Sequence, residues 1–308
     1  MRLAVFTKNY TNPAYGAARL GAERAAAALG ALVQHFVPET PDDPVQQSAL
    51  IAQALDQHPR PDAFVLSPVH PTRVDDAIRA IARAGIPIVG FVNPIAAAPS
   101  VSYVSSDDHA LAVAIARYLF AHLRAQGADS GRILVVGGPV GSYTSDERLR
   151  GFRDAARDLP SADLVGFIPG DYDRVVSRER TAAWLRGNDA SGTQALRACL
   201  AANDVMALGV REALEAAGVR DVPVVGVNAI PEAVAAIGAG RLLATADFNA
   251  MQMAYLAAEC AVRHVRGERV PASLELPVQV VDRHNCQAWD LPYAQRPVIT
   301  LDQLRKLA

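Results

Sequence analysis

Cysteine is scarce in this chain, and its spacing marks no site. The 308 residues include three cysteines, Cys199, Cys260 and Cys286. They are far apart and odd in number, and no two form a C-x-x-C pair, so the sequence predicts neither a zinc site nor a disulfide framework. Because Cys199 lies in an apolar run, we expect it to be a core residue.

Long apolar runs and blocks of charge are also missing. No apolar stretch reaches the roughly 18 residues that a membrane-spanning helix needs. The net charge is −2, with no basic run or acidic tail, which predicts no general attraction to nucleic acid or anionic lipid. Met1 leads straight into the apolar run Leu3–Phe6 with no separate export segment, so either the protein is cytosolic or a signal peptide has been removed.

Sequence motifs of common enzymes are absent as well. The chain contains neither G-x-S-x-G nor H-E-x-x-H, its histidines lack ligand spacing, and no calcium loop of the EF-hand type occurs. The glycine-rich stretch Gly137–Ser142 lacks the Lys and the frame of a phosphate-binding loop, so we interpret it as a strand-to-helix turn. We therefore expect no metal, no cofactor and no catalysis; a sugar isomerase in particular would need an acid–base pair.

Short apolar runs alternate with longer amphipathic patterns along the whole chain, and 51% of the residues are hydrophobic. This alternation is typical of βαβ units with parallel sheets, and the length is typical of two lobes. Strands are predicted at Leu3–Thr7, Leu32–Phe36, Ala63–Ser67, Pro87–Val92, Ile133–Gly137, Leu164–Ile168, Leu196–Ala201, Val222–Val227 and Leu242–Ala246. Helices are predicted at Ala14–Leu29, Val45–Gln57, Thr72–Ala84, Asp107–Gln126, Ser145–Asp158, Arg174–Arg186, Asp204–Ala217, Pro231–Ala239 and Asn249–Arg266.

The two halves of the chain share a signature. Ala84–Gly90 and Ala217–Gly226 each contain a helix end marked by Gly, followed by a buried strand. We expect two similar α/β lobes with a cleft between them and short ordered crossings capable of hinge motion. The segment Trp289–Ala308 is interpreted as an irregular C-terminal extension.

The clearest local signal is the stretch Ala198–Leu214, where an apolar run ends at Asn203 and Asp204 before a helical pattern begins. We expect the carboxylate of Asp204 to cap this helix and Asn203 to face the cleft. Ligands of open α/β sheets bind at the carboxyl ends of the strands, so Asn203 is a candidate ligand contact.

Several motifs in order resemble the type I periplasmic solute-binding proteins, in particular the ribose- and other monosaccharide-binding group. The matching segments are Asn12–Tyr15, Gly85–Val89, Val104–Asp108, Arg148–Phe152, Gly170–Arg174, Ala202–Gly209 and Val224–Asn228. The resemblance runs over Leu3–Val281. It implies two Rossmann-like lobes joined by three crossovers, one formed by residues 1–106 and 249–277 and the other by residues 107–248 and 278–308.

In the first lobe the resemblance implies ligand contacts from Asn12, Tyr15, Ser67 and Asn93. Asn12 and Ser67 each precede a proline, and the alternative for both is a simple turn. Asn93 stands where sugar-binding relatives often have Arg, and Val92 where they have Asp. The ligand is therefore not expected to be bound in the ribose manner.

In the second lobe the resemblance implies contacts from Arg148, whose guanidinium would hold ligand oxygens, and from Tyr172, which would stack on a sugar. The alternatives are a surface Arg paired with Asp146 or Glu147, and a plain turn at Tyr172. Asn228 stands where many relatives have Asp.

The end of the last predicted strand of this lobe supplies two more candidates. Ribose binders use Gln at the position of Phe248, so we expect Phe248 to pack on the ligand and Asp247 or Asn249 to make the polar contact. Ser106 is a further candidate.

Neutral amides and rings with a single Arg suit a neutral or weakly anionic polyhydroxylated molecule, which leaves pentoses, hexoses and sugar alcohols open. The resemblance implies a monomeric, non-enzymatic periplasmic receptor, its signal peptide removed, which presents its ligand to an ABC-transporter permease. One alternative is a sensing domain that signals to a kinase or chemoreceptor, with residues 289–308 as a docking segment. Another is the effector-binding part of a regulator, but such proteins carry an upstream helix-turn-helix and none precedes Leu3.

Overall fold

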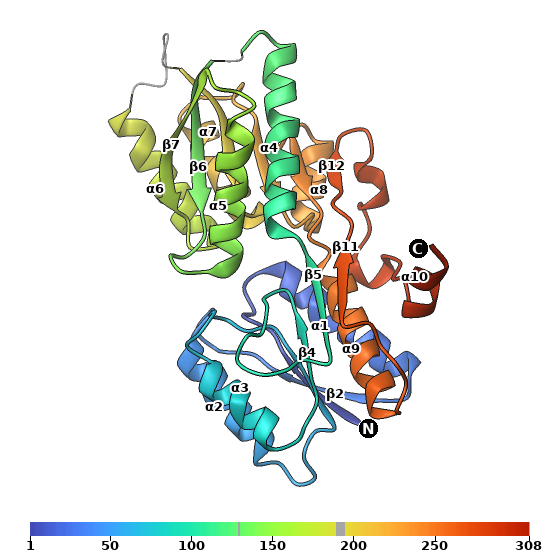
Figure 1. Cartoon of the computed structure of the whole chain (residues 1–308). Coiled ribbons are helices and arrows are strands. Elements are labelled where there is room, and N and C mark those ends of the chain that lie inside the picture. The colour runs from blue at the N-terminus through green and yellow to red at the C-terminus, as the bar shows by residue number, and fades with distance from the viewer. Residues whose placement is uncertain (129, 189–194, 308) are drawn as a thin grey trace. The chain divides into compact units, whose positions relative to one another are not determined.

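The computed structural model describes residues 1–128, 130–188 and 195–307, and it divides into two units (Figure 1). Unit 1 contains Met1–Ser106, Asn249–Pro277 and Tyr293–Ala308, of which residue 308 lies outside the described part. Unit 2 contains Asp107–Phe248 and Val278–Pro292. Each unit is an α/β structure with its own sheet, as the alternation in the sequence predicts.

The sheet of unit 1 has the strand order β11-β5-β4-β3-β1-β2, and its pairs are all parallel in the described residues. The strands are β1 (Arg2–Phe6), β2 (Leu32–Phe36), β3 (Ala63–Leu66), β4 (Ile88–Phe91), β5 (Ser102–Ser106) and β11 (Ser273–Leu276). The helices are α1 (Pro13–Ala28), α2 (Pro44–Leu55), α3 (Asp75–Arg83), α9 (Ala250–Val265) and α10 (Leu301–Leu307). A short 3-10 turn, η3 (Tyr293–Gln295), precedes α10.

The core of unit 1 is built around aromatic residues of neighbouring strands. The ring of Phe6 stacks on Phe36 at 4.8 Å and on Phe64 at 5.5 Å between centroids. Residues 3–6 of β1 are fully buried on both faces, which explains why this central parallel strand is a continuous apolar run. On the other side of the strands α1 and α9 cross closely, because a Cβ at Gly21 would lie only 2.1 Å from the carbonyl oxygen of Met251.

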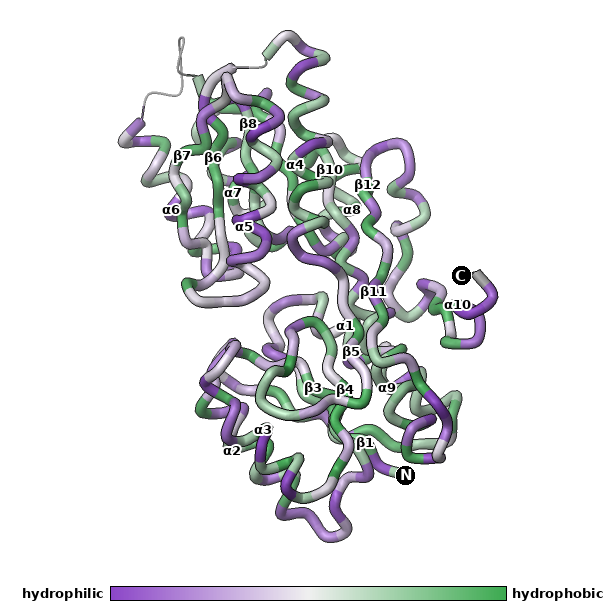
Figure 2. Tube along the Cα trace, in the orientation of Figure 1, coloured by the Kyte–Doolittle hydropathy of each residue, from purple (hydrophilic) through white to green (hydrophobic). Residues whose placement is uncertain are grey.

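Unit 2 has the strand order β12-β10-β9-β8-β6-β7, in which β12 is antiparallel to β10. The strands are β6 (Gly131–Gly137), β7 (Ala162–Pro169), β8 (Leu196–Ala201), β9 (Val224–Val227), β10 (Ala244–Ala246) and β12 (Val280–Asp282). The helices are α4 (Asp108–Ala125), α5 (Tyr143–Ala156), α6 (Arg174–Gly187), α7 (Asp204–Ala216) and α8 (Pro231–Gly238), with a 3-10 turn η2 (Cys286–Ala288) after β12. Figure 2 shows hydrophobic residues along β6 and β8, and hydrophilic residues interspersed along the neighbouring helices.

The predicted strands and helices are all present, with ends shifted by a few residues. The prediction missed β5, β11, β12 and α10. β5 has the sequence Ser-Tyr-Val-Ser-Ser and β11 the sequence Ser-Leu-Glu-Leu, which lack the apolar run by which a buried parallel strand is recognised. Cys199 is a core residue, as expected, and burial raises the pKa of its thiol to about 12.

The assignment of the C-terminal residues to the second lobe was wrong for 293–308, which belong to unit 1. The side chain of Gln252 forms two hydrogen bonds with the backbone of Ile299, at 2.6 and 2.7 Å. Glu259 accepts a hydrogen bond from the backbone N–H of Leu301 at 2.9 Å. The chain therefore passes between the units four times rather than three, at residues 106–107, 248–249, 277–278 and 292–293.

None of the described helices is both long and apolar enough to cross a lipid bilayer.

The close crossing of α1 and α9 generates a stability prediction. Gly21→Ala places a methyl group against the backbone of α9, so we expect the free energy of unfolding to fall by about 2 kcal/mol in urea denaturation. Gly16→Ala in the same helix is the matched control, because its nearest neighbour is the end of the Arg19 side chain at 3.8 Å. It should stabilise the protein by up to about 1 kcal/mol. Equal effects of the two substitutions would contradict the close approach.

Candidate functional site

In unit 1 the predicted ligand residues follow the carboxyl ends of three adjacent strands. Asn12 and Tyr15 follow β1, Ser67 follows β3 and Asn93 follows β4, and these strands are neighbours in the order β4-β3-β1. The four side chains are 0–8% exposed. The topology thus brings together, at one edge of one sheet, residues that are up to 81 positions apart.

The alternative interpretation of Asn12 as a helix or turn starter is confirmed. Its Oδ1 accepts a hydrogen bond from the N–H of Ala14 at 3.0 Å, and Pro13 occupies the first position of α1. Its own backbone N–H donates to Oδ1 of Asn9 at 2.9 Å. A role for the Asn12 side chain in ligand binding stays a prediction, in which the amide N–H groups would make the contact.

A buried lysine in the same loop was missed by the sequence analysis. Lys8 is 1% exposed, its Nζ lies 3.3 Å from Oδ1 of Asp42, and it sits 6.0 Å from the centroid of the Tyr15 ring. Asn9 donates from Nδ2 to the other oxygen of Asp42 at 2.9 Å. The available signal was a lone Lys directly after a buried strand, where a solvated surface charge is not expected.

The loop after β3 is held by a fully buried glutamine. Gln47 donates to the carbonyl of Ser67 at 3.0 Å and accepts from the N–H of Val69 at 2.9 Å. Asn93 donates to the carbonyl of Pro68 at 2.8 Å. Within the described residues the buried Oγ of Ser67 has no hydrogen-bond partner, and an unpaired buried hydroxyl is costly unless something else completes it.

In unit 2 the central residue is Arg148 of α5, which is 2% exposed, so the alternative of a surface arginine is wrong. Its Nε donates to Oδ1 of Asp108 at 2.8 Å, and its Nη1 donates to the carbonyl of Ala202 at 2.6 Å and to Oδ1 of Asn228 at 3.3 Å. The guanidinium carbon lies 4.9 Å from the centroid of the Phe248 ring. Arg148 thereby joins the first turn of α4 to the ends of β8, β9 and β10.

The helix cap expected of Asp204 is supplied by Asn203 instead. Asn203 is the N-cap of α7, and its Oδ1 accepts from the N–H of Met206 at 2.8 Å. Asp204 is fully buried and accepts from the N–H of Ile230 at 3.0 Å and from Oγ1 of Thr245 at 2.6 Å. The extended backbone of Asn203 (φ −152°, ψ 170°) is the conformation of a cap, whereas Asp204 already lies inside the helix.

The cap uses the Oδ1 of Asn203 and leaves its Nδ2 without a hydrogen bond in the described part of the chain. This nitrogen is buried, and the residue is 1% exposed. A primary amide carries two N–H donors on this nitrogen. Two buried donors at the carboxyl end of β8 therefore require an acceptor that the described protein does not supply.

Asp247 and Phe248 directly follow β10 in unit 2 and are 6% and 3% exposed. Asp247 accepts a hydrogen bond at Oδ2 from the indole Nε1 of Trp289 at 2.9 Å. Asn249, the other candidate for the polar contact, is the N-cap of α9 and accepts from the N–H of Gln252 at 3.2 Å. For both residues a polar contact with a ligand stays a prediction.

Tyr172 follows β7 and lies over the glycine turn after β6. A Cβ at Gly138 would be 2.4 Å from the Tyr172 ring, and the Tyr172 hydroxyl lies 3.2 Å from Oγ of Ser142. The turn at Tyr172 is present, with φ +56°. Ser106 ends β5 in unit 1 and is 5% exposed. For both residues ligand contact stays a prediction.

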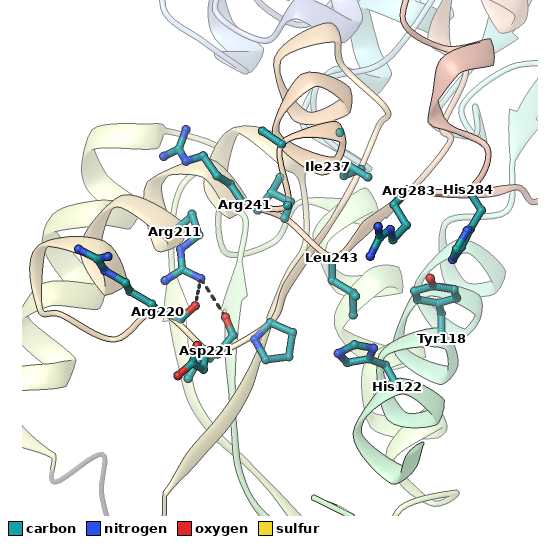
Figure 3. Close-up of a pocket in the computed structure, with 16 residues that line it drawn as sticks. Tyr118, His122, Arg211, Arg220, Asp221, Ile237, Arg241, Leu243, Arg283 and His284 are labelled. Carbon is teal, nitrogen blue, oxygen red and sulfur yellow. Dashed lines mark hydrogen bonds between the residues drawn. The ribbon is translucent and has the colours of Figure 1, made fainter. Parts of the chain in front are cut away.

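A separate cavity of about 640 Å³ lies at the amino ends of β9 and β10 (Figure 3). Its lining includes Arg211, Arg220, Arg241 and Arg283 and contains none of the predicted ligand residues. Arg211 donates to the carbonyls of Arg220 and Val222, and Arg241 pairs with Glu215. We assign these two arginines a structural role at helix ends.

Metal ligands do not gather in this protein as far as it is described: across residues 1–128, 130–188 and 195–307 no group of three or more His, Cys, Asp or Glu side chains could hold an ion.

The comparisons with known proteins show the family and the fold of the chain. The model of the periplasmic binding protein domain family matches residues 3–269. The ribose import binding protein of Escherichia coli (strain K12) is 25% identical over 279 residues, which is 91% of this chain and 90% of that protein. The D-allose-binding periplasmic protein of the same strain is 28% identical over 257 residues, covering 80% of this chain and 78% of that protein.

Two solved structures share the fold with a TM-score of 0.84. One is an ABC transporter solute-binding protein from Mycobacterium smegmatis with bound glycerol, which is 26% identical and covers 94% of this chain and 96% of that one. The other, from Actinobacillus succinogenes 130z with bound D-allose, is 22% identical and covers 93% of this chain and 99% of that one. The chain belongs to the periplasmic binding protein domain family, whose members are solute-binding receptors.

The buried carboxyl of Asp204 generates a pH prediction. Burial raises its pKa from 3.8 to about 6, and the hydrogen bonds from Thr245 and Ile230 only partly offset this. The native state therefore holds a proton between pH 4 and 6 that the unfolded chain has lost. The contribution of this proton to the free energy of unfolding is fully present below pH 4 and is lost as the pH rises through 6. Each unit of pKa difference between the native and unfolded states corresponds to about 1.4 kcal/mol.

Asp204→Asn cannot ionise, so its free energy of unfolding relative to the parent protein should rise by about 3 kcal/mol between pH 4 and pH 7. Urea denaturation at four pH values measures this difference. Asp221→Asn, at an exposed carboxyl, is the control and should follow the parent protein. Parallel curves for Asp204→Asn and the parent would show that the buried carboxyl does not titrate in this range.

Proposed function

We propose that this protein is a periplasmic receptor that binds a small sugar or polyol and delivers it to an ABC-transporter permease. Relatives named for ribose and D-allose binding, and solved structures with bound D-allose and glycerol, support this class of ligand. Membership of a family of solute-binding receptors supports binding without chemical conversion. A periplasmic location, a monomeric state and the absence of nucleic-acid binding are parts of the same proposal.

The observation that carries the proposal is the set of buried polar groups left incomplete at the strand ends. The Nδ2 of Asn203 in unit 2 and the Oγ of Ser67 in unit 1 have no partner in the described part of the chain. Each unmet group costs about 1–3 kcal/mol. A sugar hydroxyl can accept a hydrogen bond from an amide N–H, and it can donate to or accept from a serine hydroxyl. The unmet group of each unit, taken by itself, therefore suits a polyhydroxylated ligand.

Two positive charges limit the ligand further. Lys8 in unit 1 and Arg148 in unit 2 are both buried and both already paired, with Asp42 and Asp108 respectively. Because each cation has its own counterion, neither requires an anionic ligand. We therefore propose a neutral ligand and place sugar acids below sugars and polyols in affinity.

A thermal-shift screen tests the proposal. D-Ribose, D-allose, myo-inositol and glycerol are added to the protein, and a ligand at 100 times its Kd should stabilise the native state by about 2.7 kcal/mol. At least one member of the panel or of a wider set of pentoses, hexoses and polyols should raise the Tm. A complete absence of shifts across the set would reject the function.

Asn203→Asp tests the site more sharply than truncation. Aspartate keeps the oxygen that caps α7 but replaces the two N–H donors by an acceptor. We expect at least a 100-fold loss of affinity, together with a lower Tm of the unliganded protein, because the second oxygen of the buried aspartate lacks a donor. Asp43→Ala, which removes the cap of α2, is the control: it should lower the Tm and leave the affinity unchanged. Full affinity in Asn203→Asp would remove this residue from the site.

A further inference from the structure

The segment that follows the family-matched region returns to the candidate site. The family model ends at residue 269, and residues 278–292 belong to unit 2. There, β12 pairs with β10, with Val281 opposite Thr245, and the backbone N–H of Asp247 donates to the carbonyl of Gln279 at 2.8 Å. This segment therefore runs along the strand that ends at Asp247 and Phe248.

The turn after β12 is fixed by its own hydrogen bonds. Asn285 accepts from the N–H of Asp282 at 2.8 Å and donates to the carbonyl of Val280 at 2.9 Å. Cys286 is 6% exposed, and its carbonyl accepts from the N–H of Trp289 at 2.9 Å. The position of the Trp289 indole is thus determined by a turn that is anchored in the sheet.

The indole donates to Oδ2 of Asp247 at 2.9 Å. A carboxylate that is 6% exposed needs such donors, because burial without them is costly. An indole N–H is a donor without charge, so it fixes the orientation of the carboxyl group without adding a charge beside it. A carboxylate is a stronger acceptor for a hydroxyl than an amide is.

We propose that Trp289 is a positioning residue of the ligand site, which orients Asp247 to accept a hydrogen bond from a hydroxyl of the sugar or polyol. The inference rests on the proposed function and adds a determinant from outside the family-matched region. Asp247 is followed in the chain by Phe248, whose ring contacts Arg148, and its carboxylate is near enough to the buried carboxyl of Asp204 to contribute to the raised pKa of that group. The same carboxylate disfavours ligands with an acidic group at that position.

Fluorescence tests whether Trp289 senses the ligand. The chain has two tryptophans, and the second, Trp184, lies near Arg132 and Gly166 on the outer part of unit 2. In Trp184→Phe, Trp289 is the remaining tryptophan. Titration with the strongest binder among D-ribose, D-allose, myo-inositol and glycerol should change the intensity or the maximum of its emission. The Kd from this titration should equal the Kd measured by calorimetry. Calorimetric binding without any change in emission would overturn the inference.

A double-mutant cycle tests whether Trp289 acts through Asp247. Trp289→Phe keeps most of the apolar contact and removes the N–H, and we expect a roughly tenfold loss of affinity for the same ligand. In an Asp247→Asn background the same substitution should have less than a twofold effect. Equal losses in the two backgrounds would mean a purely structural role, and no loss in either would also overturn the proposal.

Binding measurements distinguish a failure of the proposed function from a failure of the proposed role of Trp289. If no sugar or polyol binds the parent protein by calorimetry, the proposed function itself is rejected. If a ligand binds and depends on Asn203 but not on Trp289, the function stands and only this inference falls. Trp184→Phe, which changes the same residue type away from the strand ends, controls for nonspecific loss of an indole and should keep the parent affinity.

Discussion

The buried guanidinium of Arg148 is the interaction on which unit 2 most depends. A charge that is 2% exposed is tolerated only if its counterion and hydrogen bonds are supplied by the fold, and here Asp108, Ala202 and Asn228 supply them. These partners come from the first turn of α4 and from the ends of β8 and β9. Removing Asp108 would leave the charge uncompensated, and removing a neutral acceptor would leave a buried N–H of Arg148 unpaired, so the guanidinium holds these strand ends as one polar platform.

The platform explains why side chains next to each other in sequence have different tasks. Asn203 caps α7 with its oxygen and keeps its two N–H donors directed elsewhere, while Asp204 turns inward to bind Ile230 and Thr245. Gly226 makes this possible, because a Cβ there would lie 2.3 Å from the Asp204 carboxylate. The predicted ligand contact of Asn203 thus depends on the burial of its neighbour Asp204.

The sequence predicted neutral amides and rings with a single arginine, whereas the strand ends of each unit also hold a buried ion pair. Lys8 with Asp42 in unit 1 and Arg148 with Asp108 in unit 2 are internally balanced pairs, and the carboxylate of Asp247 is held by an uncharged donor. Balanced pairs provide directed donors without demanding a charged ligand. This is consistent with a hydroxylated ligand and accounts for groups that the sequence analysis did not include.

The sequence by itself determined the alternation of strands and helices, the two-unit plan and the positions of polar residues after β1, β3, β4 and β6–β10, because apolar periodicity and caps are local signals. It could not determine which atoms of these residues already form hydrogen bonds within the protein, since the partners of Arg148 lie 40 to 80 positions away along the chain. It also missed Ser102–Ser106, the return of residues 293–308 to unit 1, and Trp289. Those features depend on contacts with distant strands and with α9, and only the tertiary structure brings such partners together.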